Sequence, residues 1–269
     1  MTDQTTTSDT SAALTYTSYL ALDEILEAQR PRSDEHDELL FIVIHQVYEL
    51  WFKQMLHELG RLQTVLIDGD TSHAIRTLRR VLTILKVSVA QIDVLETMTP
   101  RQFTSFRTRL DASSGFQSAQ FRELEAVLGR RDTRAFAHYP EGGEQRTRIS
   151  SAMSKPSVFD SFLTYLSVHS YDVPTESLHR DVSEPLTPSL ALQQVLLKIY
   201  ADDSGPSAVA EHLVDLDEGL QEWRYRHVKM VERTIGDKLG TGGSPGAAYL
   251  RKTLFTPIFP DLWAVRGAL

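Results

Sequence analysis

The sequence of 269 residues contains no cysteine. This absence excludes a disulfide framework, a cysteine-based zinc site, an iron–sulfur cluster and a cysteine nucleophile. A bound metal would therefore have to be held by other side chains, and the 9 histidines are the first candidates. The lack of cysteine also fits a reducing compartment, so we expect a cytoplasmic protein.

Glycine and proline are scarce, with 14 and 11 residues, which disfavours sandwiches, barrels and collagen-like chains. No apolar run reaches the roughly 18 residues that a membrane span needs, so we expect no membrane partner. The polar residues 1–13 lack the basic and apolar regions of a signal peptide. A formal charge of −8 argues against nucleic acid as a partner.

Hydrophobic periodicity predicts an all-α fold, because apolar residues recur at helical spacing and no segment alternates with a period of two. We expect residues 1–12 to be a disordered tail and residues 13–269 to be a single large helical domain. Residues 129–150, residues 170–186 and the segment after residue 254 are expected to be loops. The predicted helices cover residues 14–29, 34–60, 70–98, 99–110, 118–127, 155–166, 187–200, 206–235 and 247–254.

Capping signals support two of these helices. Thr71 or Ser72 can cap the helix over residues 70–98. Thr99 is the expected N-cap of the next helix, with Pro100 at its first position. The helix over residues 34–60 is apolar nearly all round, which is typical of a central, buried helix.

Two short motifs suggest chemistry but lack its structural context. Residues 242–246 match the G-x-S-x-G motif of a nucleophile elbow, yet no strand precedes them and Pro245 has no N–H for an oxyanion hole. Glu176 and His179 give one Glu-x-x-His pair, whereas a di-iron bundle needs two such pairs on facing helices. Both interpretations are weak.

Two histidines, His45 and His227, lie on apolar helix stripes. Each could be a neutral core histidine with one satisfied hydrogen bond. Alternatively, one or both face a buried cofactor, and a helical pocket lined by aromatic and methionine side chains suits a haem with a histidine ligand. These patterns do not say which histidine would be the ligand.

Arg107 follows Phe103 by four residues, so the two side chains share a helix face. A guanidinium group can bind a carboxylate through two parallel hydrogen bonds. The alternative is an ordinary surface arginine, like the neighbouring Arg101 and Arg109.

Several separated segments, in matching order and spacing from about Tyr16 to the C-terminus, resemble the tryptophan 2,3-dioxygenase family. A match at several motifs is more specific than any single signal above. The segments are residues 41–54 (FIVIHQVYELWFKQ), 99–107, 113–118 (SSGFQS), 225–227 (YRH) and 240–244 (GTGGS).

The resemblance implies a haem b enzyme with one haem per subunit, placed in a pocket between long central helices. The implied reaction is insertion of both atoms of O₂ across the C2–C3 bond of the indole of L-tryptophan. Its product is N-formyl-L-kynurenine, formed in the first step of tryptophan breakdown by the kynurenine route. The alternatives are a relative that oxidises another indole derivative, and a haem-binding or sensing protein without turnover.

The resemblance also implies roles for individual residues. His227 matches the proximal ligand of the haem iron, and His45 matches the distal histidine that contacts the indole N–H. Arg107 matches the residue that pairs with the substrate carboxylate. Thr241 matches a loop residue that hydrogen-bonds the substrate ammonium or carboxylate group. Phe41 matches a side chain that packs on the indole.

Further substrate contacts are implied at Ile42, Val43 and Ile44, and at Phe103, where the family has tyrosine or phenylalanine. The family assembles as a homotetramer, a dimer of dimers, in which an N-terminal segment completes the pocket of a neighbouring subunit. Pro245 departs from the small polar residue expected there. The residues of the N-terminal segment that match this role are Tyr16, Tyr19 and Leu20.

Overall fold

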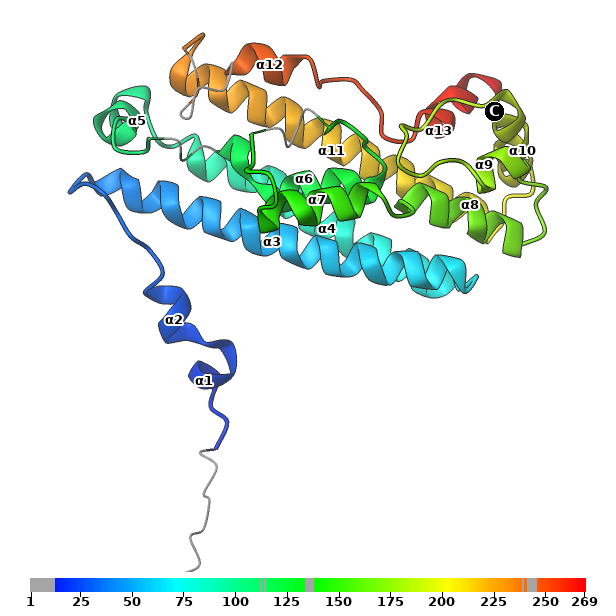
Figure 1. Ribbon diagram of the computed structural model, residues 1–269, viewed down its shortest axis with the longest axis horizontal. Coiled ribbons are helices and arrows are strands. Elements are labelled where there is room, and N and C mark those ends of the chain that lie inside the picture. Colours follow the sequence, from blue (N-terminus) through cyan, green and yellow to red (C-terminus); the bar gives the residue numbers. More distant parts are fainter. Residues whose placement is uncertain (1–12, 112, 114, 134–137, 239, 241–245) are drawn as a thin grey trace, which may run out of the picture.

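The computed structural model describes residues 13–111, 113, 115–133, 138–238, 240 and 246–269. Within these ranges the chain consists of α-helices, short 3₁₀ turns and connecting loops, with no β-strand (Figure 1). The all-α prediction is therefore confirmed. The predicted disordered tail, residues 1–12, lies outside the described residues.

Three long helices form the body of the molecule, namely α3 (His36–Ile67), α4 (Thr71–Leu95) and α11 (Gly205–Ile235). The helix α4 packs against both α3 and α11, as Figure 1 shows. Two further helices, α6 (Ala119–Leu128) and α8 (Val158–Val168), pack on α3. The core contains fully buried side chains from several of these helices, among them Leu59, Leu78, Phe162 and Leu213.

One glycine permits a close approach between two of these helices. A Cβ atom on Gly219 of α11 would lie 2.9 Å from Cδ2 of Leu85 on α4, a distance that carbon atoms do not tolerate. The absence of a side chain at Gly219 therefore keeps α11 close against α4.

Shorter elements complete the fold. Their bounds are α5 (Pro100–Arg107), α7 (Glu144–Met153), α9 (Thr175–Leu178), α10 (Leu190–Ala201), α12 (Ala247–Arg251) and α13 (Pro260–Ala264), with 3₁₀ turns η1 (Gly115–Gln117) and η4 (Val265–Ala268). α5 packs against both α3 and α11 at one end of the body, and α12 packs against α11. α10 packs against α11, α13 and η4.

The helix starts follow local capping chemistry. Thr99 caps α5, and its side chain and that of Gln102 each satisfy the other residue's backbone N–H, as a capping box requires. For α4 the expected cap, Thr71 or Ser72, was wrong. The cap is Asp70, whose carboxylate accepts a hydrogen bond from the N–H of His73, because a carboxylate one residue earlier reaches that donor.

The predicted loop over residues 129–150 was wrong in its second half, where α7 begins at Glu144. This helix has little apolar character of its own. It buries Ile149 and Met153 in a small separate cluster with Ala126 and Tyr139. Tertiary burial, rather than local sequence pattern, therefore stabilises α7.

The predicted C-terminal loop was also wrong, because α13 and η4 form there. The buried carboxylate of Asp217 on α11 accepts hydrogen bonds from the backbone N–H groups of Ile258 and Phe259, at 2.8 and 3.0 Å. It also accepts one from Nε1 of Trp263, at 3.0 Å. These bonds fasten the C-terminal segment to α11.

The helix predicted over residues 14–29 is instead two short helices, α1 (Tyr16–Leu20) and α2 (Leu22–Leu26). Ala21 separates them with a left-handed φ of 48°. We refer to residues 13–27 as the arm, because Figure 1 shows them extending away from the body. Tyr16 and Tyr19 on the arm are 75% and 71% exposed.

The central helix α3 departs from its prediction in two ways. It runs seven residues beyond Gly60, because Leu62, Val65 and Leu66 are buried in the core. It is not buried all round, since its outer side exposes apolar residues near its N-terminal half. These are Leu39, Val43 and Leu50. No helix in the described ranges is both long and apolar enough to cross a lipid bilayer.

Candidate active site

The main cavity lies between α3, α6 and α11, with further walls from α4, α5 and α12. Its volume is about 1620 Å³, including the part open to solvent. Most of the wall is apolar or aromatic, so the cavity suits a flat, apolar ligand.

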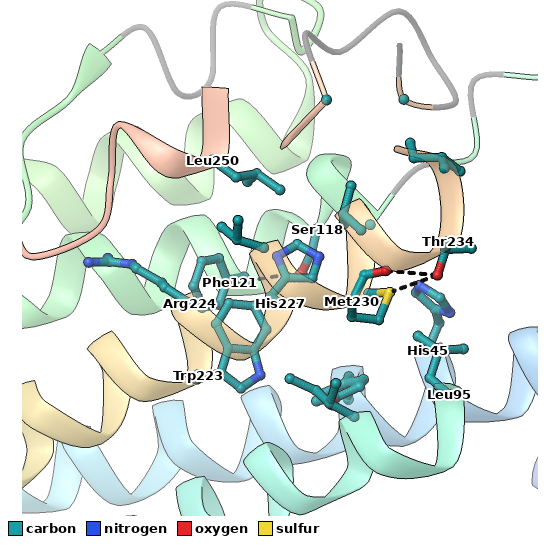
Figure 2. A pocket seen from close by; sticks show the side chains of 18 of the residues that line it. His45, Leu95, Ser118, Phe121, Trp223, Arg224, His227, Met230, Thr234 and Leu250 are labelled. Carbon is teal, nitrogen blue, oxygen red and sulfur yellow. Dashed lines mark hydrogen bonds between the residues drawn. The ribbon is translucent and has the colours of Figure 1, made fainter. Parts of the chain in front are cut away.

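One wall is a stripe of α11, on which Trp223, His227, Met230 and Thr234 recur at helical spacing (Figure 2). The rings of Trp223 and His227 are stacked, with centroids 5.2 Å apart. Burial, together with smaller effects of the nearby His45 and Arg122, lowers the pKa of His227 to about 4. The imidazole is therefore neutral near pH 7, the form that ligates a metal.

α3 also lines the cavity, with Phe41 and His45 one helical turn apart. Nδ1 of His45 lies 2.7 Å from the carbonyl oxygen of Phe41. A carbonyl only accepts, so Nδ1 carries the proton in this bond. Burial lowers the pKa of His45, although the Phe41 carbonyl and the Glu49 charge oppose this. The ring is thus neutral, and Nε2 is a hydrogen-bond acceptor.

Aromatic rings close the end of the cavity near α5. Phe41 lies 5.7 Å from Phe103 and 5.8 Å from Phe106, measured between ring centroids. Phe103 and Phe106 are 5.5 Å apart and nearly perpendicular. Such edge-to-face packing makes a rigid apolar wall, against which a planar aromatic ligand can stack.

A buried charge cluster, which the sequence interpretation missed, also lines the cavity. Glu125 on α6 accepts hydrogen bonds from Arg122 at 2.7 Å, Arg130 at 3.0 Å and Arg224 at 2.7 Å. These three guanidinium groups outweigh desolvation and lower the pKa of Glu125 to about 2. Arg224 is 4% exposed, and its NH1 atom has no hydrogen-bond partner in the structure. The cluster therefore carries surplus positive charge beside the cavity.

A second polar pair, also missed, lies on the wall near His45. The carboxylate of Glu49 accepts a hydrogen bond from Nε2 of Gln120 at 2.8 Å, and the same nitrogen donates to the Glu49 carbonyl at 2.9 Å. Glu49 follows His45 by one helical turn. For both groups the sequence signal is a charged residue on a helix face that otherwise carries the apolar residues of the cavity wall.

The structure brings together four of the predicted site residues, Phe41, His45, Phe103 and His227, on the wall of one cavity. They come from three helices, with up to 186 residues between them in sequence. In contrast, the three residues that follow Phe41 are turned away by the helical rotation. Ile44 is buried in the core, Val43 is exposed, and neither these two nor Ile42 lines the cavity.

The remaining predicted residues lie elsewhere. Arg107 ends α5, half-buried and one turn beyond Phe103. Tyr16, Tyr19 and Leu20 lie on the arm, and none of them lines the cavity. Thr241 and Pro245 are outside the described residues, as is most of the G-x-S-x-G motif. The Glu-x-x-His pair lies on and just after the single-turn α9, far along the chain from every cavity-lining element.

Comparison with known proteins decides the family. The family model described as tryptophan 2,3-dioxygenase matches residues 1–167 and 184–269. The chain belongs to the tryptophan 2,3-dioxygenase family. A protein of that name from Anaeromyxobacter sp. (strain K) is 67% identical over 259 residues, which cover 96% of this chain and 97% of the relative. Another from Herpetosiphon aurantiacus is 56% identical over 261 residues, covering 96% and 100%.

The match runs through every helix that lines the cavity, because the break in it, at residues 168–183, contains only the last residue of α8, the short α9 and the loops around it. The resemblance inferred from the separated motifs is therefore confirmed at the level of the family. Membership of the tryptophan 2,3-dioxygenases also fits the all-helical architecture and the two cavity histidines.

Proposed function

We propose that this member of the family is a haem-dependent dioxygenase that inserts both atoms of O₂ across the C2–C3 bond of L-tryptophan to give N-formyl-L-kynurenine. The observation that carries the proposal is the pairing of His45 and His227 in one apolar cavity, in a chain of this family. When bound, a ferrous haem would supply the O₂ chemistry that no side chain here can provide.

The donor atoms of the cavity fit haem b. His227 is neutral, faces the cavity, and has no hydrogen bond to its ring among the described residues, so a ring nitrogen is available as the iron ligand. Haem b also carries two propionate carboxylates. The surplus positive charge around Glu125, with the unpaired NH1 of Arg224, is the complementary partner for such groups.

His45 is proposed to orient the substrate. Its Nε2 is an acceptor inside the cavity, and the indole N–H is a donor of matching kind. His45 is not proposed as a strong base, because the indole N–H is far too weak an acid for a neutral imidazole with a lowered pKa to ionise. Phe41 and Phe103 are proposed to form the flat wall against which the indole packs.

The amino-acid end of the substrate is assigned to Arg107 and Thr241. A guanidinium fork matches the geometry of a carboxylate, and a hydroxyl can bond the ammonium or the carboxylate group. Because Phe103 has no hydroxyl, a contact that tyrosine could make there is absent. Selection for α-amino acids then rests on Arg107 and Thr241.

We further propose a homotetramer, a dimer of dimers, in which the arm completes the pocket of a neighbouring subunit. The arm supports this because Tyr16 and Tyr19 expose large aromatic surfaces and Leu20 follows them. A helical arm that exposes this much apolar surface gains stability by packing on another chain. One haem b per subunit and a cytoplasmic location complete the proposal.

The test begins with purified protein loaded with haem and reduced without air. Addition of L-tryptophan and O₂ should produce the absorbance of N-formylkynurenine. Absence of a Soret band after loading would overturn the haem assignment. A Soret band without product would instead favour another indole substrate or a haem sensor.

Histidine variants separate the two roles. His227→Ala should lose haem, and stoichiometric haem retained by this variant would show that the ligand is another residue. His45→Ala should keep haem but lose about 10²–10⁴-fold in kcat/KM, and a much larger loss would indicate obligatory proton transfer. The matched control is His212→Ala on α11, the helix that carries His227, because the His212 ring bonds the Ala208 carbonyl and does not line the cavity.

A further inference from the structure

Gly115 lies on the cavity wall directly beside the imidazole of His45. A Cβ atom on Gly115 would lie 3.5 Å from His45 Nε2 and 3.6 Å from Cδ2. No other described atom would come within 4 Å of it. The missing side chain therefore opens one specific volume, at the Nε2–Cδ2 edge of the ring.

The backbone does not require glycine at this position. Gly115 begins the 3₁₀ turn η1, whose right-handed backbone does not need glycine. Its carbonyl accepts a hydrogen bond from the N–H of Ser118, the N-cap of α6, at 3.2 Å. Any L-residue could adopt this conformation, so the consequence of a side chain is confined to the space beside His45.

That space borders the atom to which the proposed function assigns the indole N–H. His45 donates through Nδ1 to its own helix, which leaves Nε2 as the only acceptor of the ring. In an indole, the C7–H bond lies next to N1–H on the same edge of the bicycle. The other flank of N1–H is C2–H. Because the proposed reaction takes place at C2 and C3, the C2 flank is needed on the haem side, and we assign the C7 flank to the volume that Gly115 leaves open.

Resting on the proposed function, we propose that Gly115 is a specificity-determining residue, whose missing side chain admits the N1–C7 edge of the indole beside His45. Substituents at C7 enter the volume next to Gly115, whereas substituents at C5, which is meta to C7, point away from that edge of the ring. The cavity of the natural protein should therefore accept 7-methyl-L-tryptophan, and a single methyl group at residue 115 should exclude it.

The test compares Gly115→Ala with the natural protein, both loaded with haem, on L-tryptophan, 5-methyl-L-tryptophan and 7-methyl-L-tryptophan. Isothermal titration of the ferric proteins gives dissociation constants without turnover, and product absorbance gives kcat/KM. Because one misplaced methyl group changes discrimination by about 10–200-fold, the preference for the 5-methyl over the 7-methyl substrate should rise at least tenfold in the variant. Haem content and Tm should be unchanged.

The matched control is Gly60→Ala, because a Cβ on Gly60 of α3 meets no described atom within 4 Å. This control should leave all three substrates unchanged. Gly115→Ser is a second variant that tests the same volume through a polar contact. Its hydroxyl can donate to His45 Nε2, so it should weaken L-tryptophan binding by competing for the acceptor.

The outcomes separate the two proposals. An unchanged ratio of 5-methyl to 7-methyl affinities in an active, haem-loaded Gly115→Ala variant would overturn the role of Gly115. Failure of the natural protein itself to oxidise L-tryptophan would overturn the proposed function. A natural protein that oxidises L-tryptophan but rejects the 7-methyl substrate would also overturn the role of Gly115, because the volume would then be closed by another group.

Discussion

Replacing Glu125 with glutamine should destabilise the protein strongly, although the change removes only one charge. Glu125 is 6% exposed and is the shared acceptor for Arg122, Arg130 and Arg224. Glutamine has nearly the same shape but offers one acceptor oxygen and no charge. Three cations would then remain together at the base of the cavity, one of them, Arg224, deeply buried.

The magnitude follows from the pKa of Glu125, which falls from 4.5 to about 2 in the fold. At about 1.36 kcal/mol for each pKa unit, the folded state favours the carboxylate by about 3 kcal/mol. Removal of one partner from a buried ion pair costs a similar amount, about 3–5 kcal/mol. For a chain of this size, we expect Tm to fall by about 6–12 °C.

The assay is thermal unfolding of the haem-free protein at pH 7, followed by circular dichroism. The control is Glu123→Gln on the same helix, because Glu123 pairs with the partly exposed Arg148. An exposed pair contributes at most about 1 kcal/mol, so this Tm should change little. Equal Tm values for Glu125→Gln and the natural protein would refute the reasoning.

The pH dependence provides an independent check with a definite sign. The pKa of Glu125 is lower in the folded state than in the unfolded state. Its contribution to the free energy of unfolding is therefore complete above pH 4.5 and is lost as the pH falls toward 2. The natural protein should lose stability through this window. The Tm difference between it and Glu125→Gln should therefore narrow as the pH falls from 5 to 2, and a constant difference would contradict the assignment.

Three other substitutions test other parts of the structure. Asp217→Asn should lower the free energy of unfolding by about 2 kcal/mol, because it weakens three hydrogen bonds, including the one from Trp263. The tryptophan fluorescence of the C-terminal segment should therefore change at a lower urea concentration than in the natural protein. Glu38→Gln should accelerate proteolysis of the arm, because the Glu38 carboxylate binds the N–H and hydroxyl of Ser33 where the arm joins α3; an unchanged cleavage rate would refute this. Arg107→Lys should raise the KM for L-tryptophan at least tenfold with a smaller change in kcat, because lysine cannot form the two-bond contact, and equal KM values would reject the carboxylate assignment.

The long helices could be predicted because their apolar spacing is a local property of the chain. The stripes over residues 70–98 and 206–235 predicted α4 and α11 to within three residues at each end. The cap at Thr99 followed from the next residue, Pro100, which is suited to the first position of a helix. In contrast, α7 and α13 depend on distant partners, such as Tyr139 and Asp217, and local pattern does not report them.

The residues of the candidate site fall into the same two groups, those that local pattern predicts and those that only the fold brings together. His45 and His227 could be singled out because each is a polar residue on an apolar stripe. The cluster around Glu125 could not, since Arg224 is 99 residues away in sequence and only the packing of α6 near α11 brings the two together. No local pattern singles out Gly115, because its importance depends on the imidazole that it faces.

The different roles proposed for the two histidines can be argued from their local bonding, independently of family resemblance. In His45, Nδ1 is bonded to a carbonyl one turn earlier in α3, so the ring is held with Nε2 as a directed acceptor. His227 has no such bond among the described residues, and its ring is held instead by stacking on Trp223. Stacking fixes the plane of an imidazole without engaging its nitrogens. A fixed ring with an available nitrogen is what an iron ligand needs, whereas a ring anchored through one nitrogen is suited to orienting a substrate through the other.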